Sequence, residues 1–218
     1  MYSLTTLYLV RHGEATGNID RRFHGWFDSA LTENGRKQIE RLRIWFSGKQ
    51  IDALYASDLK RTRETAAVIA EEKHLSIIEN PDLREINGGD WEDVPWDDLP
   101  ILYKDSYDKW LHTPHLLEMP CGESMQAFQD RIWKAIKSII HSNAGKNVAI
   151  VTHGTAIRVL LCKIRNIPLS KMPGEGWCDN ASVTVLEEND GVISVILDGD
   201  NSHLGHLSTL EKQDWWRK

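Results

Sequence analysis

Residues 7–13 of the sequence read LYLVRHG, a short apolar run that stops abruptly at Arg-His-Gly. Such a run, with a tyrosine and a valine in it, predicts a buried strand whose carboxyl end opens into a loop. Residues 148–154 repeat the arrangement as VAIVTHG, and this run is typical of a central parallel strand. Ligand sites in open α/β sheets form at the carboxyl ends of strands, so we expect His12 and His153 in one crevice.

Helices and further strands surround these two segments. Apolar residues at helical spacing predict helices that follow caps at Thr32 and Ser57, and two more helices over residues 124–140 and 155–164. Strands are predicted at 53–56, 182–186 and 192–197, and Asn-Asp-Gly at 189–191 indicates a hairpin between the last two. This order implies an α/β fold, a three-layer α/β/α sandwich with a mostly parallel central sheet and an antiparallel edge.

Residues from about 87 to 122 differ in character from the rest of the chain. They combine a Gly-Gly pair, several prolines and three tryptophans with charged residues and show no clean period. We interpret them as a lid insertion, in which Trp91, Trp96 and Trp110 pack onto the core rather than bind an aromatic ligand. A length of 218 residues suits one α/β core, so we predict a single domain over residues 1–218 with this insertion.

Composition narrows the class of partner. The formal net charge is -6, from 26 basic and 32 acidic residues, which argues against nucleic acid or an anionic membrane as the partner. Three widely spaced cysteines suggest neither a disulfide framework nor a zinc site, and a reducing cytoplasm fits them best. The N-terminal residues resemble neither a signal peptide nor a membrane span. The remaining histidines show no metal-ligand spacing, so no metal and no cofactor are predicted.

Arg61 is a candidate anion-binding residue. It falls in the first turn of the helix after Ser57, where unpaired N–H groups and the helix dipole favour an anion. A guanidinium there would hold a phosphate in bidentate fashion. The alternative is a charge on a solvated face, because residues 60–64 read KRTRE, and for any single arginine in such a run this alternative is the better interpretation. A lone histidine at a strand end is likewise usually structural.

A set of motifs in a fixed order decides between these interpretations. Residues 9–15, LVRHGEA, together with Asn18 resemble the opening signature of the histidine phosphatase superfamily, the phosphoglycerate mutase-like proteins. Further segments match in the family's order: GWFD at 25–28, LTENG at 31–35, SDLKRTRET at 57–65, LRE at 83–85, GDWE at 89–92, GES at 122–124 and VTHG at 151–154. Each motif alone is weakly specific, but the ordered set, which spans residues 7 to about 165, is highly specific.

The resemblance implies a role for each matching position. His12 corresponds to the nucleophile, and Arg11, Arg61 and His153 to the residues around the transferred phosphoryl group. Glu85 corresponds to the proton donor to the leaving group. Substrate-binding positions are implied for four further residues, of which His24 stands where the family varies: Asn18, His24, Gly25 and Gly154.

Elementary chemistry is consistent with these roles. A neutral imidazole is a competent nucleophile near pH 7 if its other nitrogen donates a hydrogen bond that fixes the tautomer. Two arginines and a cationic histidine nearby would help to keep His12 unprotonated. Preorganised cations can stabilise the transferred phosphoryl group in place of Mg²⁺. Glu85 must be protonated to act as an acid, which requires burial or a neighbouring carboxylate, for which Asp82, Asp90 and Glu92 are candidates.

The sequence therefore predicts a metal-independent phosphatase that acts on a small anionic phosphomonoester through phosphohistidine on His12. One alternative is a phosphoglycerate mutase, but the insertion between Glu85 and Gly122 is short and lacks the Arg-Arg pair and proline-rich stretch of such mutases. A non-catalytic phospho-ligand-binding module is the other alternative, and it would be expected to lack His12, Glu85 or His153. The substrate is left open, as is a homodimer, which is common among relatives of this type.

Overall fold

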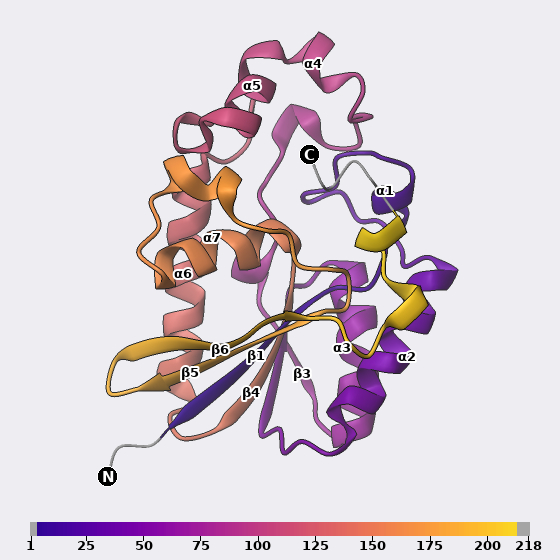
Figure 1. The fold of residues 1–218 in the computed structure, drawn as a ribbon, viewed down its shortest axis with the longest axis vertical. Coiled ribbons are helices and arrows are strands. Elements are labelled where there is room, and N and C mark those ends of the chain that lie inside the picture. Colours follow the sequence, from indigo (N-terminus) through magenta and orange to yellow (C-terminus); the bar gives the residue numbers. More distant parts are fainter. Residues whose placement is uncertain (1–3, 213–218) are drawn as a thin grey trace.

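A computed structural model describes residues 4–212 of the chain (Figure 1). At its centre lies a six-stranded sheet in the order β3-β2-β4-β1-β5-β6. The first four strands in this order are parallel to one another, and the last two are antiparallel to their neighbours. The strand bounds are β1 Thr5–Arg11, β2 Ala53–Ala56, β3 Ile77–Glu79, β4 Asn147–Thr152, β5 Val183–Asn189 and β6 Val192–Asp200.

Helices cover both faces of the sheet and complete the predicted three-layer sandwich (Figure 1). The strands alternate their side chains between two separate cores, as period-two geometry requires. Leu9 and Ile150 belong to the core that α6 and α7 cover, whereas Val10 and Val151 belong to the core beneath α2 and α3. The bounds of these helices are α2 Glu33–Ser47, α3 Lys60–Lys73, α6 Met125–Ser142 and α7 Gly154–Ile164.

The pairing of β1 with β4 places the two strand-end histidines. Val10 lies opposite Val151 and Arg11 opposite Thr152 in a parallel register. Because the register is in step, His12 and His153 leave the sheet at the same edge. The expectation that these two strand ends share one region of the molecule is confirmed.

The segment between β3 and α6 rises above this edge of the sheet (Figure 1). It contains the short helices α4 (Leu99–Leu102) and α5 (Lys104–His112), and α1 (Thr16–Ile19) flanks it. Trp91 is fully buried, and its ring lies 6.0 Å from that of Trp110 and 5.5 Å from that of Phe23. The tryptophans therefore pack against one another and the core, as expected, although Trp96 and Trp110 also border the cavity described below.

Some local predictions were wrong. Thr32 caps α2 through the N–H of Gly35 as expected, but the N-cap residue of α3 is Leu59, not Ser57, whose hydroxyl is engaged elsewhere. Strand β3 was not predicted, because its three residues are half-buried or exposed and give too short a pattern. Trp215 and Trp216, whose role the sequence leaves open, lie outside the described residues.

No helix within residues 4–212 is both long enough and apolar enough to cross a membrane.

Candidate active site

Two buried imidazoles meet at the carboxyl ends of β1 and β4. The ring centroids of His12 and His153 lie 5.2 Å apart at an interplanar angle of 63°. His12 is 3% exposed and His153 is fully buried. The pairing that the sequence predicted across more than a hundred residues is therefore present.

The hydrogen bond of His12 defines its reactive nitrogen. Its Nδ1 lies 2.7 Å from the carbonyl oxygen of Gly13. A carbonyl can only accept, so Nδ1 carries the proton and Nε2 keeps its lone pair. Burial lowers the pKa of His12 well below 6.5, and the charges of Arg61 and Arg11 lower it further. The ring is therefore neutral at pH 7.

His153 takes its partner from the start of α3. Its Nε2 lies 3.0 Å from the hydroxyl oxygen of Ser57, and both residues are fully buried. Burial, followed by the charge of Arg61, lowers the pKa of His153 well below 6.5. The expected cationic histidine is thus neutral, and the two arginines, not this ring, supply the positive charge. Nδ1 of His153 is buried and has no hydrogen-bond partner among residues 4–212.

Arg61 lies fully buried beneath the loop that follows α1. Its two terminal nitrogens donate to the carbonyl oxygens of Phe27 at 2.9 Å, His24 at 3.0 Å and Gly25 at 2.7 Å. Burial lowers the pKa of Arg61 to about 10, so the side chain stays charged at neutral pH. The solvated-face alternative is wrong. These contacts use both N–H groups of Nη2 and one of Nη1, whereas Nε, which is also buried, has no hydrogen-bond partner among residues 4–212.

Arg11, the last residue of β1, is the second arginine of the site. It is 3% exposed, and its Nη1 donates to the carbonyl oxygen of Cys178 at 2.7 Å. Gly154, the first residue of α7, lies against it. A Cβ added to Gly154 would be 3.2 Å from Nε of Arg11, so a glycine lets this guanidinium approach the helix start.

A third histidine and two asparagines form a chain beside His12. Nδ2 of Asn18 lies 3.2 Å from Nε2 of His24, whose Nδ1 contacts the hydroxyl of Ser29 at 3.0 Å. The rings of His24 and His12 are 6.0 Å apart. Asn180, which sequence analysis did not single out, donates to the carbonyl oxygen of His12 at 3.1 Å and to Oδ1 of Asn18 at 3.3 Å.

Glu85 is the carboxyl group of the site. Its oxygens accept the backbone N–H groups of Ile86 at 2.9 Å and Thr155 at 3.0 Å. Burial is the main influence on the group and raises its pKa above 4.5. No nearby carboxylate contributes to this rise. Glu92, one of the candidates for that role, instead accepts N–H groups of the loop after α1, those of Trp26 and Phe27 at 2.7 Å each.

Gly25 joins that loop to the Glu85 segment. A Cβ on Gly25 would lie 2.1 Å from the carbonyl oxygen of Ile86, so no other residue fits without a backbone shift. The close approach brings the loop that holds Arg61 against the segment that holds Glu85.

These groups open into a cavity of about 830 Å³. Its inner end is lined by Arg11, His12, Asn18, His24, Gly25 and Glu85, whereas Arg61 and His153 lie just behind this surface. Aromatic side chains form much of the outer wall: Phe23, Trp96, Tyr107, Trp110 and Trp177.

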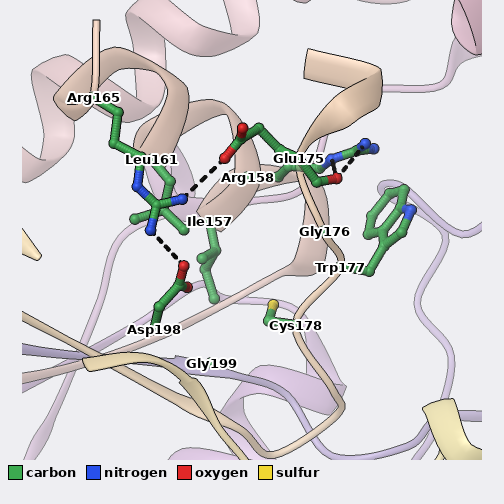
Figure 2. Close-up of a pocket in the computed structure, with 10 residues that line it drawn as sticks. All are labelled: Ile157, Arg158, Leu161, Arg165, Glu175, Gly176, Trp177, Cys178, Asp198 and Gly199. Atoms are coloured by element: carbon green, nitrogen blue, oxygen red, sulfur yellow. Dashed lines mark hydrogen bonds and ion pairs between the residues drawn. The ribbon is translucent and has the colours of Figure 1, made fainter. Parts of the chain in front are cut away.

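A smaller cavity of about 180 Å³ adjoins the first, and four residues line both: Arg158, Glu175, Gly176 and Trp177 (Figure 2). Arg158 donates to the carbonyl oxygen of Glu175, and its guanidinium carbon lies 4.5 Å from the centre of the Trp177 ring. Arg165, the residue that follows α7, pairs with the Glu175 carboxylate at 2.9 Å and with Asp198 (Figure 2). One arginine in α7 and one at its end thus fix the segment that forms this wall.

Fold and cavity together define an α/β enzyme whose site is built from imidazole, guanidinium and one half-buried carboxyl group, a set suited to transfer of an anionic group. The chain belongs to the histidine phosphatase superfamily (branch 1), whose family model matches residues 7–200.

Several similar proteins carry the names of phosphatases. Phosphoserine phosphatase 1 of Hydrogenobacter thermophilus is 33% identical over 87% of this chain and 90% of its own length. The metal-independent phosphoserine phosphatase of Arabidopsis thaliana is 32% identical over 96% and 87%. A probable phosphoglycerate mutase, GpmB, of Yersinia pestis is 35% identical over 74% and 75%. Among solved structures, Bacillus stearothermophilus YhfR matches 92% of this chain and 99% of its own at a TM-score of 0.89 and 36% identity.

Proposed function

We propose that this member of the superfamily is a phosphatase that hydrolyses a small phosphomonoester through a phosphohistidine on His12. The observation that carries the proposal is the 2.7 Å hydrogen bond from Nδ1 of His12 to the Gly13 carbonyl, which leaves Nε2 as a neutral nucleophile. Glu85 is the proton donor, and its pKa, raised by burial, keeps the acid form accessible nearer neutral pH.

In the first step Nε2 of His12 attacks phosphorus, and the bond from phosphorus to the ester oxygen breaks. The departing oxygen takes the proton of Glu85, so a neutral alcohol leaves and Glu85 becomes a carboxylate. In the second step this carboxylate takes a proton from water as the water oxygen attacks phosphorus. The bond from phosphorus to Nε2 breaks, inorganic phosphate is released, and Glu85 is again protonated.

The transferred phosphoryl group needs positive charge and hydrogen-bond donors around its equatorial oxygens. Arg11 and Arg61 supply the charge, and Asn18, His24 and the backbone around Gly25 and Gly154 complete the binding surface. His153 contributes as a neutral donor: if the Ser57 hydroxyl donates to Nε2, the ring proton sits on Nδ1, the nitrogen that has no protein partner in residues 4–212. A proton on this nitrogen would be available to the phosphoryl group.

The mechanism uses no metal ion. Within residues 4–212 no group of three or more histidine, cysteine, aspartate or glutamate side chains could hold one. The cations that balance the phosphoryl charge are the two buried arginines. The name of the metal-independent relative from Arabidopsis thaliana is consistent with this proposal.

The proposed substrate class extends beyond phosphoserine. A cavity of about 830 Å³ with several aromatic side chains in its outer wall leaves room for a leaving group larger than a three-carbon acid. We therefore include ring-bearing phosphomonoesters with phosphoserine among the substrates to be tested.

The proposal is tested by replacing the proton donor and following two products. Glu85→Gln should lower kcat for phosphoserine by roughly 10²-fold or more, because general acid–base catalysis contributes about 10²- to 10⁴-fold. The parent enzyme incubated with 3-phosphoglycerate should release inorganic phosphate. Accumulation of 2-phosphoglycerate without phosphate would establish the mutase alternative instead.

A further inference from the structure

The Gly-Glu-Ser motif at residues 122–124 does not line the active-site cavity, yet Gly122 and Glu123 contact the segment that carries Glu85, and Ser124 stands at the start of α6. Ser124 caps α6 by accepting the N–H of Ala127 at 3.1 Å. A Cβ on Gly122 would lie 2.3 Å from the carbonyl oxygen of Asn87, so this close approach requires glycine. Glu123 accepts the N–H of Asn87 at 2.9 Å, two residues beyond Glu85.

Glu123 also holds Arg131, which lies two turns into α6. The pair is bidentate: Nε and Nη2 of Arg131 donate to the two carboxylate oxygens of Glu123, each at 2.7 Å. The side chains are only 16% and 19% exposed. A planar guanidinium in such a fork has a fixed orientation.

The Arg131 guanidinium also donates to the main chain of residues 82–85, here called the acid segment because it carries Glu85. Nη1 donates to the carbonyl oxygens of Asp82 at 2.9 Å and Arg84 at 3.1 Å, and Nη2 donates to that of Glu85 at 3.0 Å. The Glu85 carbonyl accepts a second bond, from Nε1 of Trp26 at 2.9 Å. The backbone of Glu85 is therefore fixed from two sides, whereas its carboxyl group faces the cavity.

From this geometry we propose that Glu123 and Arg131 are positioning residues for proton transfer: the pair fixes the backbone of Glu85 so that its carboxyl group reaches the ester oxygen. The inference rests on the proposed function, in which Glu85 is the acid. In this proposal the Gly-Glu-Ser motif serves to align the Glu85 carboxyl group. Neither Glu123 nor Arg131 lines the substrate cavity, so both act without touching the substrate. A displacement of about 1 Å at a reacting group can cost roughly 10²-fold in rate.

Leaving-group dependence separates a positioning role from a purely structural one. An alkyl phosphate such as β-glycerophosphate needs a proton on its departing oxygen, whereas p-nitrophenolate leaves without one. Arg131→Met and Glu123→Gln should each lower kcat/KM for the alkyl phosphate by about tenfold or more and kcat/KM for p-nitrophenyl phosphate by less than about threefold. The ratio kcat/KM reports the steps up to transfer onto His12, whereas kcat also includes the hydrolysis step that both substrates share and in which Glu85 acts as the base. A general loss of structure would lower both by the same factor.

A matched control comes from an ion pair of the same kind elsewhere in the fold. Arg43 links α2 to α3 through Glu40 and Glu72, far along the chain from the acid segment. Arg43→Met should leave the ratio of the two kcat/KM values at the parent value. Thermal melts of every variant check that each one is folded at the assay temperature.

A double-mutant cycle then ties the effect to Glu85. In a Glu85→Gln background, Arg131→Met should lower alkyl phosphate turnover by less than about twofold, because the acid on which it acts is already gone. Full additivity of the two losses, or an unchanged ratio of the kcat/KM values in the single variants, would overturn the positioning role. If Glu85→Gln itself left alkyl phosphate turnover intact, the acid assignment would fail, and that outcome is recognisable before Arg131 is considered.

Discussion

Removing the hydroxyl of Ser57 should damage catalysis and stability together. In the folded protein this hydroxyl is the hydrogen-bond partner of His153 Nε2 at 3.0 Å, and both residues are fully buried. Ser57→Ala therefore leaves the buried Nε2 without this partner. Since Nδ1 has no partner within residues 4–212 either, neither ring nitrogen would then have a side-chain or main-chain partner there. An unsatisfied buried polar group costs roughly 1–3 kcal/mol.

The catalytic loss follows from the same contact. Without Ser57 nothing in the described chain fixes which ring nitrogen of His153 carries the proton, and the ring can also turn. If the aligned His153 donor stabilises the transition state by roughly 1.4–2.7 kcal/mol, loss of the Ser57 hydroxyl that orients it should lower kcat by about tenfold to a hundredfold. We expect kcat for phosphoserine to fall by that factor and KM to change less.

Steady-state kinetics and urea unfolding measure the two effects. Ser106→Ala is the matched control, since Ser106 is also buried but donates to the carbonyl of Tyr103 in the lid, 3.2 Å away. It should cost stability on the order of 1 kcal/mol with little change in kcat. Equal kcat for Ser57→Ala and the parent enzyme would refute the role given to this hydroxyl.

Three further predictions concern pH, the lid and metal ions. Burial lowers the pKa values of His12, His24 and His153 below 6.5 in the folded chain, so the unfolded chain binds more protons below that pH. The free energy of unfolding should therefore fall as the pH drops below 6.5, by up to about 4 kcal/mol per pH unit. Urea melts that give the same free energy of unfolding at pH 7.5 and 5.5 would contradict this. Trp91→Ala should lower the free energy of unfolding by about 3–5 kcal/mol in thermal or urea unfolding, because the ring is fully buried. Trp91→Phe should lower it much less, because it removes an indole N–H that has no partner in the described chain. Activity with phosphoserine should survive prolonged EDTA treatment; inactivation that Mg²⁺ or Zn²⁺ reverses would count against a metal-free site.

The sequence predicted the parts of the site that depend on strand order. His12 and His153 each follow an apolar run, and parallel neighbours must end at one edge of the sheet, so their meeting could be anticipated. The family motifs added Arg61 and Glu85. Residues with no local signal were missed: Asn180 lies after an irregular segment, and its contact with the His12 carbonyl exists only in the folded chain.

Ser57 illustrates why local rules reach a limit. A serine before a helical segment is an ordinary N-cap signal, and the prediction followed that rule. In the structure its hydroxyl bonds His153, 96 positions away, and Leu59 takes the cap position without a side-chain cap. The Ser57 hydroxyl keeps only a long local contact, with the N–H of Leu59 at 3.5 Å, and its shorter hydrogen bond is the tertiary one to the site, so the departure from the local rule marks a functional position.

Arg61 shows the converse. Its sequence context resembles a solvated helix face, yet the side chain is fully buried and donates to three carbonyls of the loop after α1. Burying a guanidinium is costly unless its donors are satisfied, so the loop carbonyls explain how the charge can stay in place. Burial is the main cause that lowers the pKa of His12, and the charge of Arg61 lowers it further.

Direct mapping of the phosphoenzyme addresses the central claim, that His12 accepts the phosphoryl group. The enzyme would be mixed briefly with ³²P-labelled phosphoserine or labelled p-nitrophenyl phosphate, quenched in alkali to preserve phosphohistidine, and digested for mass spectrometry. We predict label on Nε2 of His12 and none in His12→Ala, which should also lose turnover. Label on any other residue, or turnover by His12→Ala at the parent rate, would contradict the account.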